Sequence, residues 1–443
     1  MKDQQKKMDE FYSVAGDTPY LQVLETVQRY MTGVENTEEM DVWQYKKHIQ
    51  TCITTRGLKC RGASTLSQLV DRLYNSMREY DLLTDYLTPE VYTRMGIEEI
   101  YGRWNCIYMK TKKGKIRLTE TFPSAEHARA IFNRITSGYN QQINEGTPIA
   151  LGEFRPNIRA SFTGTPVTSK EMGIEFNIRI VHGSAMTREL LLESGTFHPK
   201  ALDFLELCIR YGANICIAGA TGSGKTGTMY YLLSTVARDA TKRIGTIEIE
   251  SREFDLLQLD ENGVPLNDVF SWVTRSSDDS RYNIPANKLV ETILRFTPDI
   301  IGLGEMRNEE ALAVSELALT GHGAITTLHA ASAQAAYSRI VDLCKKAGSS
   351  YNDATLFRRA IRAFPIIVFQ ERLADGRRRV LSIVEGVGYA DEDADVKPLF
   401  RFEIEDNTAG KVLGKHVQTG QISRELRQTL LQHGASRKEL EGF

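Results

Sequence analysis

The stretch Asn214–Ala237, NICIAGATGSGKTGTMYYLLSTVA, decides the fold of this chain. Its first five residues are mostly apolar and predict a short, buried parallel strand. A glycine-rich turn follows, and the residues from Lys225 onward have helix-compatible spacing. A strand, a glycine loop and a helix in this order predict an α/β unit with a ligand at the end of the strand.

The turn matches the pattern G-x-x-x-x-G-K-[ST] in the structural context that the pattern requires. Its glycines let successive N–H groups face one anion, and the helix that follows adds its positive end. We expect Lys225 to reach the outer phosphates of a nucleoside triphosphate and the Thr226 hydroxyl to hold Mg²⁺. An ordinary glycine turn is the alternative, but it needs pattern and context to coincide by chance. The predicted phosphate-binding residues are Gly219, Ala220, Thr221, Gly222, Ser223, Gly224, Lys225, Thr226 and Gly227.

The whole chain has 443 residues, with 55 Lys and Arg against 57 Asp and Glu, and a net charge of −2. This length predicts two or three domains with sizeable cores. The balanced charge argues against nucleic acid as the main partner. Six cysteines are scattered without a C-x-x-C pair. We therefore expect reduced thiols, and neither a zinc site nor a disulfide framework.

The opening MKDQQKKMDEFYS is polar and lacks the apolar core of a signal peptide. No uninterrupted apolar stretch approaches the ~18 residues that a spanning helix needs. We expect a cytoplasmic protein without a transmembrane segment, which reaches the membrane only through a partner.

Hydrophobic periodicity divides the chain into four parts. Residues 1–94 carry apolar residues at helical spacing and predict a helical segment. Residues 95–182 predict a small α+β domain with a hairpin, one helix and further strands. Residues 183–199 are expected to be a polar linker with a short helix, and residues 200–443 the nucleotide-binding domain with a C-terminal extension of strands and a helix.

Two acids follow predicted strands of the nucleotide-binding domain. Glu250 ends one strand, with Glu248 and Glu253 nearby, and Glu305 ends a second. Carboxylates at the carboxyl edge of a parallel sheet suit a water-mediated hold on Mg²⁺ or the orienting of an attacking water. A solvated acid after a strand is the alternative for each. Which of the three neighbouring glutamates acts stays open, and Glu250 is preferred for its place at the strand end.

A third strand of this domain delivers His329 to the same edge, and His322 lies in the glycine turn before it. A histidine there can donate to a γ-phosphate. A lone histidine, however, is more often a packed side chain than a functional one.

Several motifs together resemble the secretion ATPases, the motors of type II secretion, type IV pili and type IV secretion. The resemblance covers about residues 95–443. It rests on order and spacing as well as on residue types. The segments that carry it are Gly219–Thr226, Leu294–Asp299, Gly304–Arg307, Thr320–Gly323 and His329–Ala330.

Within this family the chain looks most like the tight-adherence (Flp-type) pilus branch, because of its helical beginning and its tail after Pro398. It departs from the family at Glu250, which precedes Ser251 where the family has Asp. A second departure is Gly227, where the family often has a second Thr.

The resemblance implies a RecA-like P-loop ATPase domain preceded by a small α+β (PAS-like) domain. It also implies ATP and Mg²⁺ as ligands, a hexameric homo-oligomer and an inner-membrane platform protein as partner. Arg159 and Arg179 in the small domain, and Arg275, fall where the family has nucleotide-facing arginines. For each of them a surface or linker salt bridge is the alternative.

These observations predict an ATPase that powers pilus assembly or secretion. The first alternative is a conjugation-type DNA-transfer ATPase or a nucleic-acid translocase, although no basic groove with interleaved aromatic residues is visible. The second is a nucleotide-binding regulator with little turnover, against which the intact glycine loop and Glu305 argue.

Overall fold

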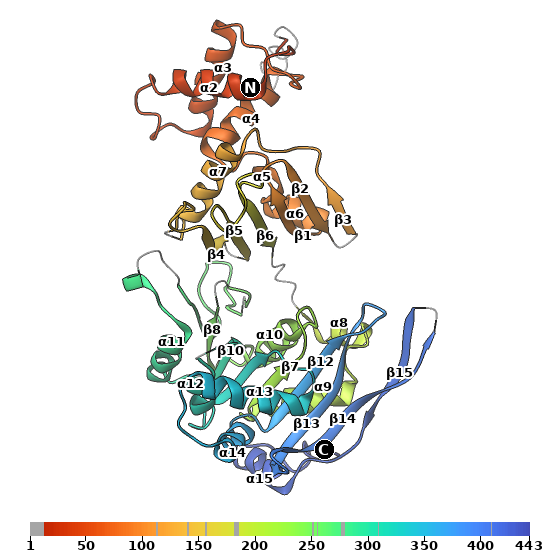
Figure 1. Cartoon of the computed structure of the whole chain (residues 1–443). Coiled ribbons are helices and arrows are strands. Elements are labelled where there is room, and N and C mark those ends of the chain that lie inside the picture. The colour runs from red at the N-terminus through yellow and green to blue at the C-terminus, as the bar shows by residue number, and fades with distance from the viewer. Residues whose placement is uncertain are drawn as a thin grey trace. The chain divides into compact units, whose positions relative to one another are not determined.

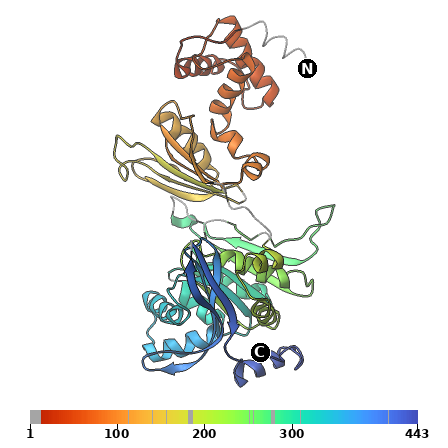
Figure 2. The ribbon, with the colours of Figure 1, turned by 90° about the vertical axis from the view of Figure 1, so that its right-hand side faces the viewer.

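The computed structural model describes residues 13–443 except 112–113, 140, 156, 181–185, 250–251, 255, 276–279, 309 and 409. Its described residues form two compact units (Figures 1 and 2). The first holds residues up to 180 together with Ser280, and the second holds residues 186–275 and 281–443.

The first unit begins with helices that pack on one another through apolar stripes. Local signals start two of them: the Asp41 side chain accepts from the Gln44 N–H in a capping box, and Thr65 caps the next long helix. The buried side chains of the first three helices form a core of their own, whereas Leu83 of the fourth lies in the core of the sheet that follows. The helices are α2 Tyr20–Met31, α3 Val42–Thr55, α4 Leu66–Arg78, α5 Leu83–Tyr86 and α6 Pro89–Met95.

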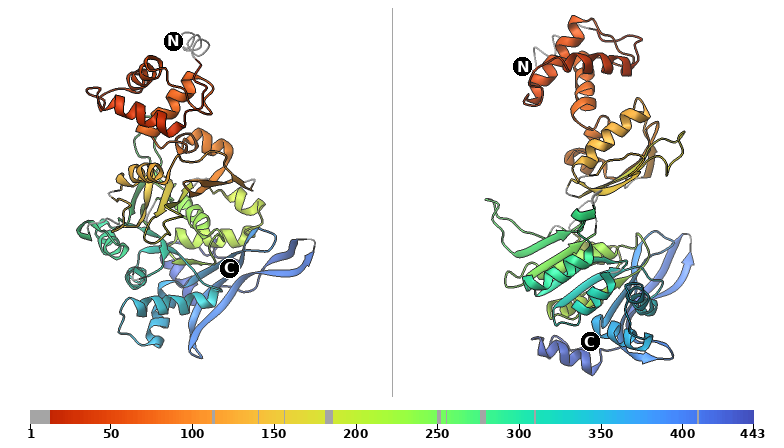
Figure 3. Two further views of the ribbon diagram at one scale, coloured as in Figure 1. Left: turned by 45° about the horizontal axis from the view of Figure 1, so that its top comes forward. Right: turned by 60° about the vertical axis from the view of Figure 1, so that its left-hand side comes forward.

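A sheet with one covering helix completes the first unit. Among the described residues its strand order is β3-β2-β1-β6-β5-β4, and neighbouring strands pair antiparallel. Helix α7 packs on one face, so the strand residues toward it are buried and the alternate ones are not (Figure 3). The elements are β1 Ile97–Arg103, β2 Cys106–Thr111, β3 Gly114–Arg117, α7 Ala125–Ser137, β4 Ile149–Arg155, β5 Ile158–Thr163 and β6 Glu175–Ile180.

Buried polar contacts join the helical part to the sheet part. The Ser76 hydroxyl donates to Asp81 Oδ2 at 2.8 Å, and His127 Nε2 of α7 lies 2.5 Å from the same oxygen. The Tyr20 hydroxyl lies 2.6 Å from Ser76 Oγ. The helical segment and the α+β part, expected as separate domains, thus share one polar network inside one unit.

The second unit is built on a mixed sheet. In the described chain its order is β15-β14-β13-β12-β7-β11-β10-β8-β9. The strands from β12 to β9 pair in parallel, and β13, β14 and β15 add an antiparallel edge. The strands are β7 Ile215–Ala218, β8 Arg243–Glu248, β9 Asp268–Val273, β10 Ile300–Met306, β11 Gly323–Leu328, β12 Ile366–Arg372, β13 Arg378–Ala390, β14 Asp393–Thr408 and β15 Lys411–Gln418.

Helices cover both faces of this sheet, so the central strands are buried and almost wholly apolar (Figure 1). One core contains residues of α9 and α10, and a second contains residues of α12, α13 and α14. The helices are α8 Arg188–Glu193, α9 Pro199–Arg210, α10 Lys225–Val236, α11 Ala286–Ile293, α12 Glu310–Leu317, α13 Ala333–Lys346, α14 Asp353–Ala363 and α15 Arg424–Gln432, with 3₁₀ turns at Ser280–Tyr282 and Leu294–Phe296.

Part of the expected linker is built into the second unit. Leu191 of α8 and Phe197 are each 3% exposed and belong to its core. The segment contains apolar side chains that are buried in the same core as α9. A prediction based on its polar residues alone overlooked them. No helix within the described residues is long and apolar enough to cross a membrane.

The order of the parallel strands confirms the expected fold class. Strand β11 lies between β7, which carries the glycine loop, and β10, which carries Glu305. An inserted strand at this place defines the RecA-like arrangement. The carboxyl ends of β7, β8, β10, β11 and β12 lie at one edge, where open parallel sheets bind their ligands.

Candidate functional site

The glycine loop joins β7 to α10, as the sequence predicts (Figure 1). Three of its glycines have positive φ: Gly219 at 153°, Gly222 at 79° and Gly224 at 97°. These values turn the chain back sharply before the helix begins. The first N–H groups of α10 have no partner within the helix and are available to an anion. The Ser223 hydroxyl is buried and has no hydrogen-bond partner among the described residues.

Lys225 is held at the centre of the loop. Its Nζ donates to the carbonyl oxygens of Gly219 and Ala220, each at 3.0 Å. Burial lowers the pKa of Lys225, and the negative charge of Glu305 opposes this shift. Phosphate oxygens can replace the two carbonyls as acceptors, so the lysine is ready for an anion.

Glu305 of β10 lies in a cluster of ionisable side chains. Its Oε2 is 2.6 Å from an Arg307 guanidinium nitrogen, and its Oε1 is 2.9 Å from His329 Nε2. Oε1 is nevertheless buried without a well-aligned hydrogen-bond donor in the described part of the chain. A buried carboxylate oxygen with unfilled bonding capacity fits a hydrated cation or a catalytic water.

His329 follows β11 at the same edge. Burial lowers the pKa of His329, and the positive charge of Lys225 lowers it further. The ring is therefore neutral near pH 7, with one N–H donor and one acceptor nitrogen. His322, by contrast, lies at the other end of β11, where its Nδ1 is 2.7 Å from the Pro298 carbonyl oxygen.

Glu248 is the acid at the end of β8. Its Oε2 accepts from the N–H groups of Glu253 and Phe254, and the Ser271 hydroxyl donates to Oε1 at 3.1 Å. Burial raises the pKa of Glu248 to about 7 against the effect of these hydrogen bonds. Sequence reasoning extended the strand to Glu250, which lies outside the described residues, so its role stays a prediction.

Arg275 is exposed just after β9. Its backbone pairs with Ile284, and its guanidinium carbon lies 5.9 Å from the Tyr282 ring centroid. Arg159 and Arg179 belong to the first unit. They face each other on β5 and β6, with Glu153 of β4 opposite Arg159 and Glu99 of β1 opposite Arg179.

The two arginines lie on the sheet face away from α7, because the alternate residues Ile158, Ala160, Ile178 and Ile180 fill the core under that helix. Arg179 is exposed and Arg159 is half-buried. Their charged row crosses the sheet, since the register continues from Glu99 to Lys110 of β2. Arg159 and Arg179 are thus neighbours in this row, with an acid on either side of the pair.

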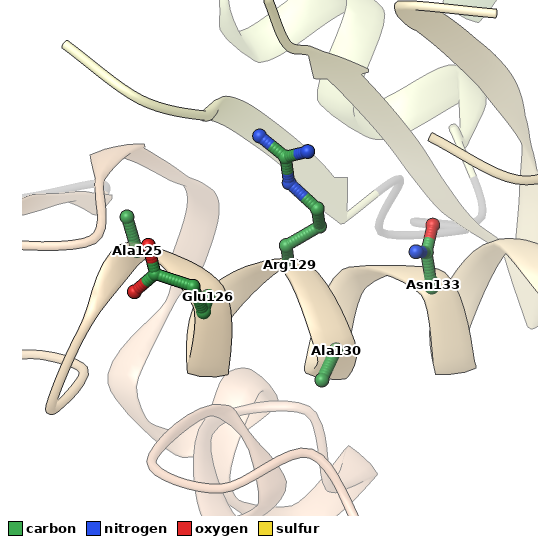
Figure 4. A pocket seen from close by; sticks show the side chains of 5 residues that line it. All are labelled: Ala125, Glu126, Arg129, Ala130 and Asn133. Atoms are coloured by element: carbon green, nitrogen blue, oxygen red, sulfur yellow. The ribbon is translucent and has the colours of Figure 1, made fainter. Parts of the chain in front are cut away.

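A separate hollow of about 350 Å³ lies along α7 (Figure 4). Asn133 there accepts a hydrogen bond from the Ile143 N–H, so it serves the fold. None of the residues that line the hollow is a predicted site residue; they are Ala125, Glu126, Arg129, Ala130 and Asn133.

Two residues of the glycine-loop region were missed by sequence reasoning. Gln370 of β12 accepts a hydrogen bond at its Oε1 from the buried Thr228 hydroxyl at 2.8 Å. Arg378 of β13 donates from Nε to the Gly222 carbonyl oxygen at 3.1 Å. Neither belongs to a motif, and only the neighbourhood of β12 and β7 in the sheet brings them to the loop.

The fold and the loop define a class, a P-loop protein with RecA-like strand order. The sequence pattern of the type II/IV secretion system protein family matches residues 149–373, just over half of the chain. The chain belongs to this family. The match includes Arg159, Arg179, the glycine loop and Glu305.

Relatives with names extend this finding. The chain is 34% identical over 189 residues to the type IV secretion system protein PtlH of Bordetella pertussis, which is 41% of this chain and 52% of PtlH. It is 32% identical over 185 residues to the type IV secretion system protein VirB11 of Bartonella henselae, covering 41% and 48%. The chain thus spans about half the length of the curated relatives it matches first.

Among solved structures, the Legionella pneumophila ATPase DotB is similar with a TM-score of 0.48 and 20% identity, over 67% of this chain and 78% of DotB. The fold assignment rests on the strand order described above.

Proposed function

We propose that this chain is a motor ATPase, which hydrolyses ATP to ADP and phosphate and powers pilus assembly or secretion. One observation carries the proposal. Lys225 of the glycine loop is close enough to Glu305 for the negative charge of Glu305 to raise its pKa. The Oε1 atom of Glu305 is itself buried without a well-aligned hydrogen-bond donor among the described residues. A phosphate-binding lysine beside an acid with unfilled bonding capacity is what in-line attack by water requires.

Each side chain then has a distinct role. The loop N–H groups bind the phosphates, and Lys225 exchanges the Gly219 and Ala220 carbonyls for phosphate oxygens. Glu305 orients the attacking water, and neutral His329 donates to the γ-phosphate. Glu250, which follows β8 by two residues in the sequence, remains the second acid of this proposal.

Mg²⁺ fits this donor set. The Thr226 hydroxyl, at the start of α10, would be a direct ligand, and Glu305 would hold the ion through water. When bound, Mg²⁺ supplies positive charge that offsets the charge of the β- and γ-phosphates.

Arginines from outside the loop complete the charge balance in this proposal. Arg159 and Arg179 are supported by their paired positions on the sheet face away from α7, and Arg275 by its exposure near the end of β9. One lysine and one Mg²⁺ leave part of the transition-state charge uncompensated, and an added arginine typically contributes ~10³–10⁵ in rate.

The finer assignment is the tight-adherence (Flp-type) pilus branch, a hexameric ring and a place at the cytoplasmic membrane through an inner-membrane platform protein. Family membership supports a secretion role, and the helices α2–α6 and the tail support the branch. Light scattering with an ATP analogue tests the ring: a fully active monomer at micromolar concentration would contradict it.

Glu305→Gln tests the function. Gln keeps the shape of the side chain and loses its charge, so we expect nucleotide binding to persist and phosphate release to slow by more than tenfold, ~1.4 kcal/mol of barrier. Fluorescent-nucleotide binding and phosphate release are measured together. Equal loss of both would make Glu305 a structural residue, and stimulation of the wild type by single-stranded DNA would favour a nucleic-acid translocase instead.

A further inference from the structure

The turn between β12 and β13 forms one side of the glycine loop. A Cβ atom placed on Gly219 would lie 1.9 Å from the Gln370 carbonyl oxygen, and one on Gly224 would lie 2.8 Å from Arg378 Cδ. Two glycines of the loop therefore pack directly on this hairpin. The contact comes from strands about 150 residues further along the chain, which the sheet order places next to β7.

Arg378 reaches the exposed bend of the loop. Its Nε donates to the Gly222 carbonyl oxygen at 3.1 Å. The peptide bond is planar and trans, so the N–H of Ser223 points to the side opposite that carbonyl. The hydrogen bond thus sets the direction of the Ser223 N–H, which donates to the Ala220 carbonyl oxygen at 3.3 Å and closes the turn of the loop.

The turn that carries Arg378 is braced from its other side. Both guanidinium NH groups of Arg379 meet the carboxylate of Asp375, at 3.0 and 2.9 Å. The Val412 N–H of β15 also donates to Asp375, and Arg379 donates to the Val412 carbonyl oxygen. The hydrogen bonds to Asp375, that from Arg379 above all, hold the pKa of this carboxyl well below its usual range. A bidentate pair of this kind fixes geometry as well as charge.

We propose that Arg378 is a positioning residue of the phosphate-binding loop. From the braced turn, its Nε–H holds the Gly222 carbonyl outward and keeps the Ser223 N–H on the Ala220 carbonyl, so that the loop stays in the shape that receives the phosphates. The residue acts on the polyphosphate part of the ligand and not on base or sugar. This inference rests on the proposed function, because it assumes a nucleotide in the loop.

Full-length Arg378→Ala is compared with Arg377→Ala, the neighbouring exposed arginine, by titration with a fluorescent ATP analogue and by competition with inorganic tripolyphosphate. We expect Arg378→Ala to weaken both ligands about tenfold, the effect of one lost hydrogen bond to a charged group. Arg377→Ala should bind both as the wild type does. Arg378→Lys keeps the charge without the Nε–H donor and should not restore binding.

Three results would overturn the inference: wild-type affinity in Arg378→Ala, a loss confined to the ATP analogue, or full rescue by Arg378→Lys, which would leave only an effect of charge. Matching circular dichroism and melting temperature show that each variant is folded. If the wild type binds neither ligand, the proposed function fails together with this inference. If it binds both and Arg378→Ala is silent, the inference alone fails.

Discussion

Glu248 is a buried acid whose surroundings change its pKa strongly. Burial raises its pKa from 4.5 to about 7, although two backbone N–H groups and the Ser271 hydroxyl donate to it. The folded state therefore holds this proton more tightly than the unfolded state does.

This difference predicts a pH dependence of stability. Between about pH 4.5 and 7 the unfolded chain has lost the proton and the folded chain has kept it, so stability falls as pH rises and levels off above 7. Relative to Glu248→Gln, we expect the wild type to lose at most about 3 kcal/mol over this range. Melting temperatures of both proteins from pH 4.5 to 8 measure it. A constant difference across that range would show that Glu248 has an ordinary pKa in the folded chain.

The acids also show where single residues escape prediction. Lys225 starts α10 and Glu305 lies one residue before the end of β10, close to where a motif and a strand end predicted them, and their roles stay predictions. The strand that begins at Arg243 was predicted to run to Glu250, since Ile249 continues the alternation of apolar residues. In the structure this strand, β8, ends two residues earlier, at Glu248. Whether an acid is buried and held by N–H groups depends on the loop that folds over it.

The β12–β13 hairpin restricts which side chains the glycine loop can carry. Gly219 has φ at 153°, and any side chain there would collide with the backbone of Gln370. Gly219→Ala should therefore displace the loop and abolish nucleotide binding. Gly348→Ala is the matched control: its φ of 86° carries a similar backbone penalty, but nothing lies within 4 Å of its Cβ position. It should cost about 1 kcal/mol of stability and leave binding unchanged.

Fluorescent-nucleotide titration and thermal melting of the two variants decide this prediction. Equal, mild effects of both would mean that the close approach of β12 to Gly219 does not constrain the loop.

At this scale, hydrophobic periodicity and turn residues found most of the elements. The helix at Ala125–Ser137 begins after Ser124, where it was expected, and the strand Gly323–Leu328 follows its glycine turn. Strand β4 was missed. The pairing of Ile366–Gln370 with the strand before the glycine loop was missed as well, because an apolar run does not identify its neighbour in a sheet. Three consecutive arginines at 377–379 could not be told apart, since only the hairpin register decides which reaches the loop.

The described molecule has one unit that holds the glycine loop and a smaller unit that carries Arg159 and Arg179. We expect Arg159→Ala and Arg179→Ala in the full chain to cut turnover by about a thousandfold or more, the lower end of the range known for arginines supplied to phosphoryl transfer, and to weaken ATP binding far less. Arg103→Ala is the control on the same sheet face, where Arg103 pairs with Glu175 at 3.6 Å.

Phosphate release and nucleotide binding of the three variants are measured side by side. Unchanged turnover in both Arg159→Ala and Arg179→Ala would leave these residues as surface charges of the small unit and the active site complete without them.

We propose that the glycine loop of the second unit is an ATP-hydrolysing site, and Lys225→Ala is the sharpest test of this proposal. Steady-state phosphate release is measured for the wild type and the variant, with circular dichroism to show that both are folded. The wild type should hydrolyse ATP, and the variant should retain less than about a tenth of that rate, a loss of at least ~1.4 kcal/mol in barrier. A folded variant that keeps more than a tenth of the wild-type rate would contradict the assignment.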